Sequence, residues 1–212
     1  MSTIKKVTSA GESDKTLTMY NPKHFINDNI DELNSLIDQY PFATLITGEE
    51  VGHLPLYREG NKLVGHMARR NQLKLGEKVK VVFNGPQTYI NSSWYAKNDV
   101  PTWNYAVVHI DGNLKLIEDN KGILKILNFS NDHMNQQYEE KWDMYVPEDL
   151  RGEQLSKAIV GIEISIDNIE GKFKLSQNRN DADYAGVLEG LSRREDEMSQ
   201  KIRQLMTRPQ PR

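Results

Sequence analysis

Residues 53–67 read HLPLYREGNKLVGHM and carry the clearest local signal in the chain. Two extended runs flank Glu59-Gly60-Asn61, a triplet typical of a tight turn between antiparallel strands. Pro55 has no backbone N–H to donate, so its run belongs at an edge or a bulge. Working outward, short strands are also predicted at 43–47, 79–83, 87–90 and 105–115, with a turn at Asn84-Gly85-Pro86. Six short strands separated by turns predict a β-barrel rather than a parallel sheet.

Helical patterns surround these strands and place the chain in the α+β class. Apolar residues recur at helical spacing over 28–40, over 121–140 and along a charged tail helix at 189–206. A further helix at 147–157 leads into an alternating strand at 160–166. We therefore expect a barrel with peripheral helices. The predicted organisation is a polar arm at 1–18, one domain at 19–192 and a charged helical tail at 193–212.

The composition excludes several classes of protein. The chain has 212 residues, 27% of them charged, a formal net charge of −3 and no cysteine. Disulfides, thiolate metal sites and cysteine nucleophiles are therefore excluded, and the histidines do not have metal-binding spacing. Without a signal peptide or an apolar run of about 20 residues, a cytoplasmic protein that does not enter the membrane is expected. There is no global basic field to attract DNA, so contact with DNA would need a local patch, and the tail is the candidate.

Three constellations could carry a binding site. The first is His66-Met67-Ala68-Arg69-Arg70-Asn71, where a strand is expected to enter a short helix near Leu73. Free N–H groups at a helix start favour a phosphate, and an arginine would add charge-assisted hydrogen bonds. The alternative is a pair of solvated arginines.

The second constellation is aromatic and the third is polar. Ser92-Ser93-Trp94-Tyr95 and Val100–Tyr105 place two tryptophans and two tyrosines on either side of a turn. Flat rings of this kind could hold a flat cofactor or pack in a core or a dimer interface. Residues 170–179, EGKFKLSQNR, are too polar for a core strand. They could hydrogen-bond a polar ring edge or a phosphate, or form an exposed loop.

Five ordered strings carry a resemblance to a known family. They are MYNPKHF (19–25), GHMARRN (65–71), FNGPQTYINSSWY (83–95), VPTWNYAVVHIDG (100–112) and VGIEISIDNIEGKFKLSQNR (160–179). In this order the chain resembles the PaiB-type FMN-binding negative transcriptional regulators over roughly residues 19–192. No Walker loop, dinucleotide fingerprint or helix-turn-helix competes with this resemblance.

The resemblance implies a fold, a cofactor and a site. The implied fold is an FMN-binding split β-barrel that forms a homodimer, with the flavin in a groove between subunits. His66, Ala68, Arg69 and Asn71 would lie on the phosphate and ribityl side, and Ser93, Trp94, Thr102 and Trp103 would form an aromatic wall. Lys174, Ser176, Gln177 and Asn178 would reach the site from the C-terminal half, from the same or the other subunit.

The function implied by the resemblance is negative regulation, with no catalytic residue assigned. Its partner would be DNA or a regulatory protein. Two alternatives stay open: a flavin-dependent oxidoreductase of the pyridoxamine phosphate oxidase type, in which the flavin performs the chemistry, and a haem-binding split barrel.

Overall fold

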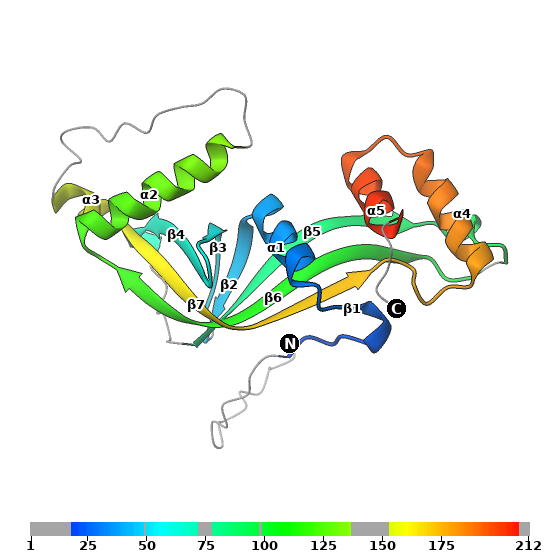
Figure 1. The fold of residues 1–212 in the computed structure, drawn as a ribbon, viewed down its shortest axis with the longest axis horizontal. Helices are drawn as coiled ribbons and strands as arrows, with labels where there is room; N and C mark the ends of the chain where they lie inside the picture. The colour runs from blue at the N-terminus through cyan, green and yellow to red at the C-terminus, as the bar shows by residue number, and fades with distance from the viewer. Residues whose placement is uncertain (1–17, 49, 72–77, 98, 137–152, 208–212) are drawn as a thin grey trace, which may run out of the picture.

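All seven strands of the described chain lie in one antiparallel sheet, and five α-helices surround it (Figure 1). The computed structural model describes residues 18–48, 50–71, 78–97, 99–136 and 153–207. The strands are β1 (Ile26–Asn27), β2 (Phe42–Thr47), β3 (Glu50–Arg58), β4 (Lys62–Ala68), β5 (Lys78–Ile90), β6 (Thr102–Ile117) and β7 (Ile159–Lys174). The helices are α1 (Ile30–Gln39), α2 (Asn120–Asn135), α3 (Glu153–Ala158), α4 (Asp181–Ser192) and α5 (Glu197–Thr207), with 3-10 turns η1 (Lys23–Phe25), η2 (Arg69–Asn71) and η3 (Ser92–Trp94).

The sheet closes on itself. Its strand order is β1-β7-β4-β3-β2-β5-β6, and an additional β7–β6 pairing joins the last strand back to the second. Six strands thus form a ring, and β1 adds to the edge of β7. The hairpin predicted around Glu59-Gly60-Asn61 is confirmed: β3 and β4 are antiparallel, and Gly60 has a φ of 63° in the turn. The predicted α+β class and β-barrel are confirmed.

The strands β5, β6 and β7 extend beyond the ring. β2 pairs with β5 only at residues 80–83, and β4 pairs with β7 only at residues 159–165. Residues 87–90, 102–108 and 169–174 of β5, β6 and β7 continue together, and we call this part the sheet extension. Figure 1 shows α2 and α3 near the ring end of these strands and α4 and α5 near the extension.

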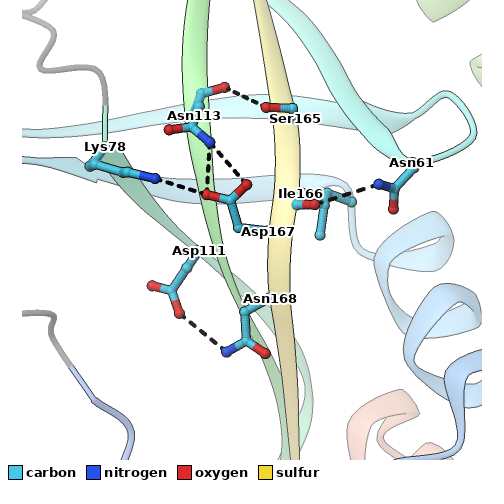
Figure 2. A network of polar contacts seen from close by, with 8 residues as sticks. All are labelled: Asn61, Lys78, Asp111, Asn113, Ser165, Ile166, Asp167 and Asn168. Atoms are coloured by element: carbon cyan, nitrogen blue, oxygen red, sulfur yellow. Dashed lines mark hydrogen bonds and ion pairs between the residues drawn. The ribbon is translucent and has the colours of Figure 1, made fainter.

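A polar network marks the bend where the ring passes into the extension (Figure 2). The β6–β7 register shifts between Asp111 and Gly112, which leaves Asp167 as the extra residue of a β-bulge. The Asp167 carboxylate accepts two hydrogen bonds from Asn113, at 2.9 and 2.7 Å, and pairs with Lys78 at 3.1 Å. A Cβ at Gly112 would lie 2.4 Å from the Ser165 carbonyl oxygen, so the close approach of the strands needs glycine there.

The C-terminal segment is part of the main core, although it differs from the expected single helix at 189–206. The prediction of one helix is wrong: α4 ends at Ser192, and α5 begins at Glu197 after Asp196 accepts a hydrogen bond from the Ser199 N–H. Because Asp196 caps a new helix in this way, the chain turns between the two. On α5, Ile202 and Met206 are buried in the same cluster as the barrel core.

Two other local predictions are wrong for physical reasons. The separate strands at 79–83 and 87–90 form one strand, β5, and the expected turn at Asn84-Gly85-Pro86 is an irregularity within it. The polar stretch from residue 170 to 174 is the end of β7, because its side chains alternate between the two faces of the sheet. Phe173 is buried in the core, and Lys172 and Lys174 project from the opposite face. Residues 1–17 of the arm predicted at 1–18, the helix near Leu73 and most of the helix at 147–157 lie outside the described residues. Within the described chain, no helix is long and apolar enough to cross a membrane.

Candidate functional site

The predicted site residues fall into two groups at opposite ends of β7. His66, Ala68, Arg69 and Asn71 lie where β4 ends against the first residues of β7, and we call them the β4-end group. Ser93, Trp94, Thr102, Trp103, Lys174, Ser176, Gln177 and Asn178 lie around the last residues of β7, and we call them the β7-end group. Lys174 lies thirteen positions along β7 from Gly161, the partner of His66. At roughly 3.3 Å per residue, the two groups are about 40 Å apart along the strand.

Arg69 of the β4-end group already binds protein atoms. Its Nε donates to the Ser156 carbonyl oxygen at 2.6 Å, and its Nη1 pairs with a Glu118 carboxylate oxygen at 2.8 Å. These bonds fix η2 against α3 and the residue after β6, while Arg70 beside it is exposed. The guanidinium is therefore held in a defined place with donors to spare, as the fork geometry of arginine allows.

His66 has a ring nitrogen without a partner. Its Nδ1 is buried and has no hydrogen bond to a described residue. Burial lowers the pKa of His66 from its ordinary 6.5, so the ring is neutral at pH 7. Buried polar atoms are normally satisfied, and an orphaned one is what a ligand hydroxyl or a bound water would complete. The side chain of Asn71 lies outside the described part of the chain.

Lys174 organises the β7-end group. Its Nζ donates to the Thr102 hydroxyl and to the Trp103 carbonyl oxygen, both at 2.6 Å. Burial, followed by the charges of Arg179 and Lys172, lowers the pKa of this amine. Since two of its three donors are used to tie β7 to β6, one N–H remains for an anionic or carbonyl oxygen.

Ser176 and Gln177 shape the end of β7. Ser176 has a φ of 65°, and its buried hydroxyl exchanges hydrogen bonds with the side-chain amide of Asn104, at 3.0 and 3.1 Å. Gln177 accepts from the Leu175 N–H and donates to the Phe173 carbonyl oxygen. Both side chains therefore hold the backbone that turns away from Lys174, whereas the side chain of Asn178 is exposed.

The two tryptophans of the aromatic wall have different surroundings. Trp103 is 52% exposed and meets Tyr89 edge to face, with ring centroids 6.1 Å apart. Trp94 instead packs on α4, where a Cβ added to Gly190 would lie 2.1 Å from the indole. Ser93, next to Trp94, has an exposed side chain. Trp103 therefore offers an open aromatic face, while at least one face of Trp94 is covered.

The loop between these tryptophans is fastened to the start of α4. Arg179 forms an ion pair with Asp99 and lies 4.4 Å above the Tyr95 ring. Asp183 of α4 accepts a hydrogen bond from the Ala96 N–H at 2.8 Å. The loop thus has a defined position beside Trp103, as a preformed binding wall requires.

Sequence reasoning missed several exposed apolar side chains, of which Tyr89 lies beside Trp103 and the others lie further along the sheet. Large apolar side chains lie in the open on β2, β3 and β5: Phe42 is 66% exposed, Val51 56% and Tyr89 40%. Phe42 also stacks on His53, with ring centroids 6.5 Å apart. The alternation of these strands was the available signal, because every second residue must point away from the barrel core. Of these side chains, only Tyr89 meets Trp103, and we call these two rings the open apolar surface.

The residues of the two groups fit different parts of FMN, although one chain holds the groups apart. Arg69 would offer cationic donors to a phosphate, His66 has an unsatisfied ring nitrogen, Lys174 would offer an N–H to a ring oxygen, and Trp103 has an open face for stacking. The described residues contain no group of three or more histidine, cysteine or carboxylate side chains that could hold a metal ion.

Comparisons with known proteins agree with this chemistry. Residues 19–168 match the family described as "Putative FMN-binding domain". The chain is 34% identical over 206 residues to "Protease synthase and sporulation protein PAI 2" of Bacillus subtilis, covering 89% of this chain and 96% of that protein. Among solved structures it is similar to the flavocytochrome Anf3 from Azotobacter vinelandii, at a TM-score of 0.55 and 17% identity, over 76% of this chain and 75% of that one. A similar match, at a TM-score of 0.55 and 15% identity, is the FAD and haem binding protein from Mycobacterium smegmatis, over 70% of this chain and 73% of that one. At these identities the structural matches speak for the fold, which is the predicted split barrel.

Proposed function

Since the chain belongs to the FMN-binding domain family, we propose that two copies of it bind FMN between them and act as a regulatory flavoprotein. The observation that carries the proposal is the placement of the two residue groups. Each group has part of what FMN requires, and about 40 Å of β7 separates them in one chain, far more than one FMN spans. A second copy in antiparallel arrangement would bring the β7-end group of one protomer to the β4-end group of the other.

The open apolar surface supports the dimer. Contiguous exposed apolar side chains on a water-soluble sheet mark interaction sites, and aromatic residues are enriched in the buried parts of interfaces. Trp103 and Tyr89 lie in this surface beside Lys174. The dimer groove would therefore bury the rings that also line the flavin.

Each group has a definite role in the proposed site. Arg69 would hold the phosphate, and His66 would complete its hydrogen bonding with a hydroxyl or a phosphate oxygen. Trp103 would cover one face of the isoalloxazine, and the remaining N–H of Lys174 would donate to an oxygen of the ring. Bound FMN supplies one- and two-electron redox chemistry, and the protein orients it and excludes water.

A flavin titration combined with native mass measurement tests the cofactor and the dimer. We expect quenching of flavin fluorescence with a dissociation constant below about 50 µM, and a dimer with one FMN per protomer. A monomer that binds FMN would contradict the shared groove. A dimer that leaves free flavin unchanged at this concentration would remove the cofactor from the proposal.

The regulatory role rests on the resemblance to the PaiB-type regulators and on the 34% identity to the protease synthase and sporulation protein PAI 2. Transcripts should change when the gene is deleted and return to normal with the wild-type gene but not with Trp103→Ala. Unchanged transcripts in the deletion strain would end the regulatory role and leave FMN binding untouched. Direct DNA contact through the tail has little to support it, because Arg193, Arg194 and Lys201 each pair with a neighbouring carboxylate.

A further inference from the structure

Within the described chain, the first three residues of β6 lie past the end of its ladder with β7. The β6–β7 pairing ends at Tyr105 and Lys174, whereas residues 102–104 of β6 pair with β5. Trp103 lies in this stretch, and Lys174 is the last residue of β7. The position of Trp103 relative to Lys174 is therefore set by side chains and not by the regular hydrogen bonds of a sheet.

Two side-chain contacts join this stretch to the end of β7, one on each face of the sheet. On the outer face, Lys174 donates to the Thr102 hydroxyl and to the backbone of Trp103. On the core face, the hydroxyl of Ser176 and the side-chain amide of Asn104 exchange hydrogen bonds at 3.0 and 3.1 Å. Asn104 is fully buried and Ser176 is 3% exposed, so this pair can act on a ligand only through its neighbours.

The backbone of Ser176 has a conformation that needs support. Its φ of 65° lies in the left-handed region, which residues with a side chain seldom adopt and which persists only where the surroundings hold it. The Arg179 N–H donates to the Ser176 carbonyl oxygen at 3.0 Å, and the Ser176 hydroxyl donates to Asn104. The exchange with Asn104 therefore fixes the turn after β7 against the residue next to Trp103.

The Asn104 amide also reaches the C-terminal helices. Its nitrogen lies 3.6 Å from the Met206 sulfur, and the Tyr184 hydroxyl donates to the Met206 carbonyl oxygen at 2.6 Å. Buried polar groups whose hydrogen bonds are satisfied in a network specify one arrangement of a core. The Asn104 side chain is thus held from two sides, by the turn after β7 and by α5.

We propose that Asn104 and Ser176 are positioning residues of the flavin site, because their buried exchange sets the distance and angle between the Trp103 ring and the Lys174 ammonium. This inference rests on the proposed function, in which both groups contact the flavin ring. Without the exchange, the start of β6 is joined to the end of β7 through Lys174, which the ligand also needs. Trp103 then samples several positions, and a ligand that requires one of them binds more weakly.

The full-length variants Ser176→Ala and Ser176→Gly test the pair, with Ser199→Ala as the matched control. The Ser199 hydroxyl forms a buried bond of 2.8 Å with Thr88, which joins α5 to β5 and not β6 to β7. Both Ser176 variants should weaken FMN binding about fivefold and change the visible absorption band of the bound flavin. They should also shift the indole N–H resonance of Trp103 in the ligand-free protein, a resonance identified by its loss in Trp103→Phe. Ser199→Ala should lose stability and keep all three properties.

The two substitutions at Ser176 separate positioning from stability. Glycine relieves the positive φ and alanine does not, so Ser176→Gly should unfold at a higher denaturant concentration than Ser176→Ala. Both variants lack the hydroxyl, so the Trp103 resonance should shift equally in both. Asn104→Ala combined with Ser176→Ala should weaken FMN binding no more than Asn104→Ala does, because the two residues act as one pair.

Two results overturn the positioning role. One is a Trp103 resonance that stays at its wild-type place in both Ser176 variants. The other is an equal shift in Ser199→Ala, since the loss of any buried hydrogen bond would then have the same effect. A wild-type protein that does not bind FMN ends the proposed function, whereas normal FMN binding with unshifted resonances in the variants ends this inference and leaves the proposed function intact.

Discussion

The two ends of β7 are built in opposite ways. At the ring end, helices cover the strand, and Arg69 is bonded to Glu118 and Ser156. At the extension, Trp103 is half exposed and Lys174 keeps a donor free. One end is thus fixed before any ligand arrives, whereas the other presents a surface that needs a partner. Under the proposed function, this difference means that a single chain would hold two incomplete half-sites, one for an anion and one for a flat ring.

The largest expected effect comes from adding a side chain at Gly190, which packs against Trp94 beside the extension. Gly190→Val should destabilise the protein by about 3 kcal/mol, because a Cβ at Gly190 would lie 2.1 Å from the Trp94 indole and the packing would have to open. Chemical denaturation measures the free energy of unfolding. Glu189→Val, one residue earlier on an exposed position of α4, is the control and should change stability by less than about 0.5 kcal/mol. Equal losses in both variants would mean that the helix, and not the Trp94 contact, is sensitive.

The sheet extension itself is tested by the variant Trp103→Ala. We expect loss of about 2 kcal/mol in FMN binding, or roughly thirtyfold, with weaker dimerisation, because an aromatic anchor of the interface is removed. Fluorescence titration and sedimentation velocity measure the two effects. Tyr20→Ala removes an aromatic side chain that is 83% exposed and outside the open apolar surface, and both properties should stay at wild-type values. A stable dimer of Trp103→Ala with normal flavin affinity would refute the role given to this end.

The contrast between the ends also explains what could be predicted from the sequence. The ring end was readable, since Glu59-Gly60-Asn61 specifies a hairpin and the strands around it are short and apolar. The extension could not be predicted, because residues 170–174 carry three charged side chains and therefore look too polar for a strand. In the structure they project from one face of the sheet, and Phe173 points into the core from the other. The break between α4 and α5 was missed because the apolar spacing runs on through the Asp196 cap.

The site residues were chosen by resemblance, and their spatial relation was beyond sequence reasoning. Nothing in the order of the motifs reveals that His66, on β4, lies against one end of β7 while Lys174 lies at the other end, since that depends on which strands pair with β7. Glu118, the partner of Arg69, and Tyr89, the partner of Trp103, were missed for the same reason. Contacts across a sheet follow from register, and register follows from the whole fold.

The ring end is tested by substituting its two neighbouring arginines, Arg69 and Arg70. Arg69→Ala should weaken FMN binding about tenfold and Arg70→Ala by no more than about twofold, because only Arg69 is held in place by other residues and an exposed arginine must be ordered on binding. Titrations at two salt concentrations separate a direct phosphate contact from general charge. Equal effects of the two substitutions would sink the assignment of the phosphate side to Arg69.

The smallest expected effect is a pH dependence of the free energy of unfolding, caused by His66 at the ring end. Burial lowers the pKa of His66 below its ordinary 6.5 in the folded protein, so below about pH 6.5 the unfolded chain binds a proton that the folded one resists. Stability contributed by the neutral ring is therefore present above pH 6.5 and decreases as the pH falls through that value. His66→Gln should reduce the slope of unfolding free energy between pH 7 and 5, by at most about 1.4 kcal/mol per pH unit.

The slope that remains in His66→Gln should come from His109, whose pKa is lowered chiefly by burial and also by the charge of Lys80. His24→Gln, a change at an exposed position, serves as the control and should leave the slope as it is in the wild type. Because FMN at the ring end would satisfy the orphaned Nδ1 of His66, added FMN should change the slope more in the wild type than in His66→Gln, where only the phosphate, with a second pKa of about 6, still titrates. A slope that FMN changes equally in both proteins would place the ligand away from His66 and would end the phosphate-side assignment of the β4-end group.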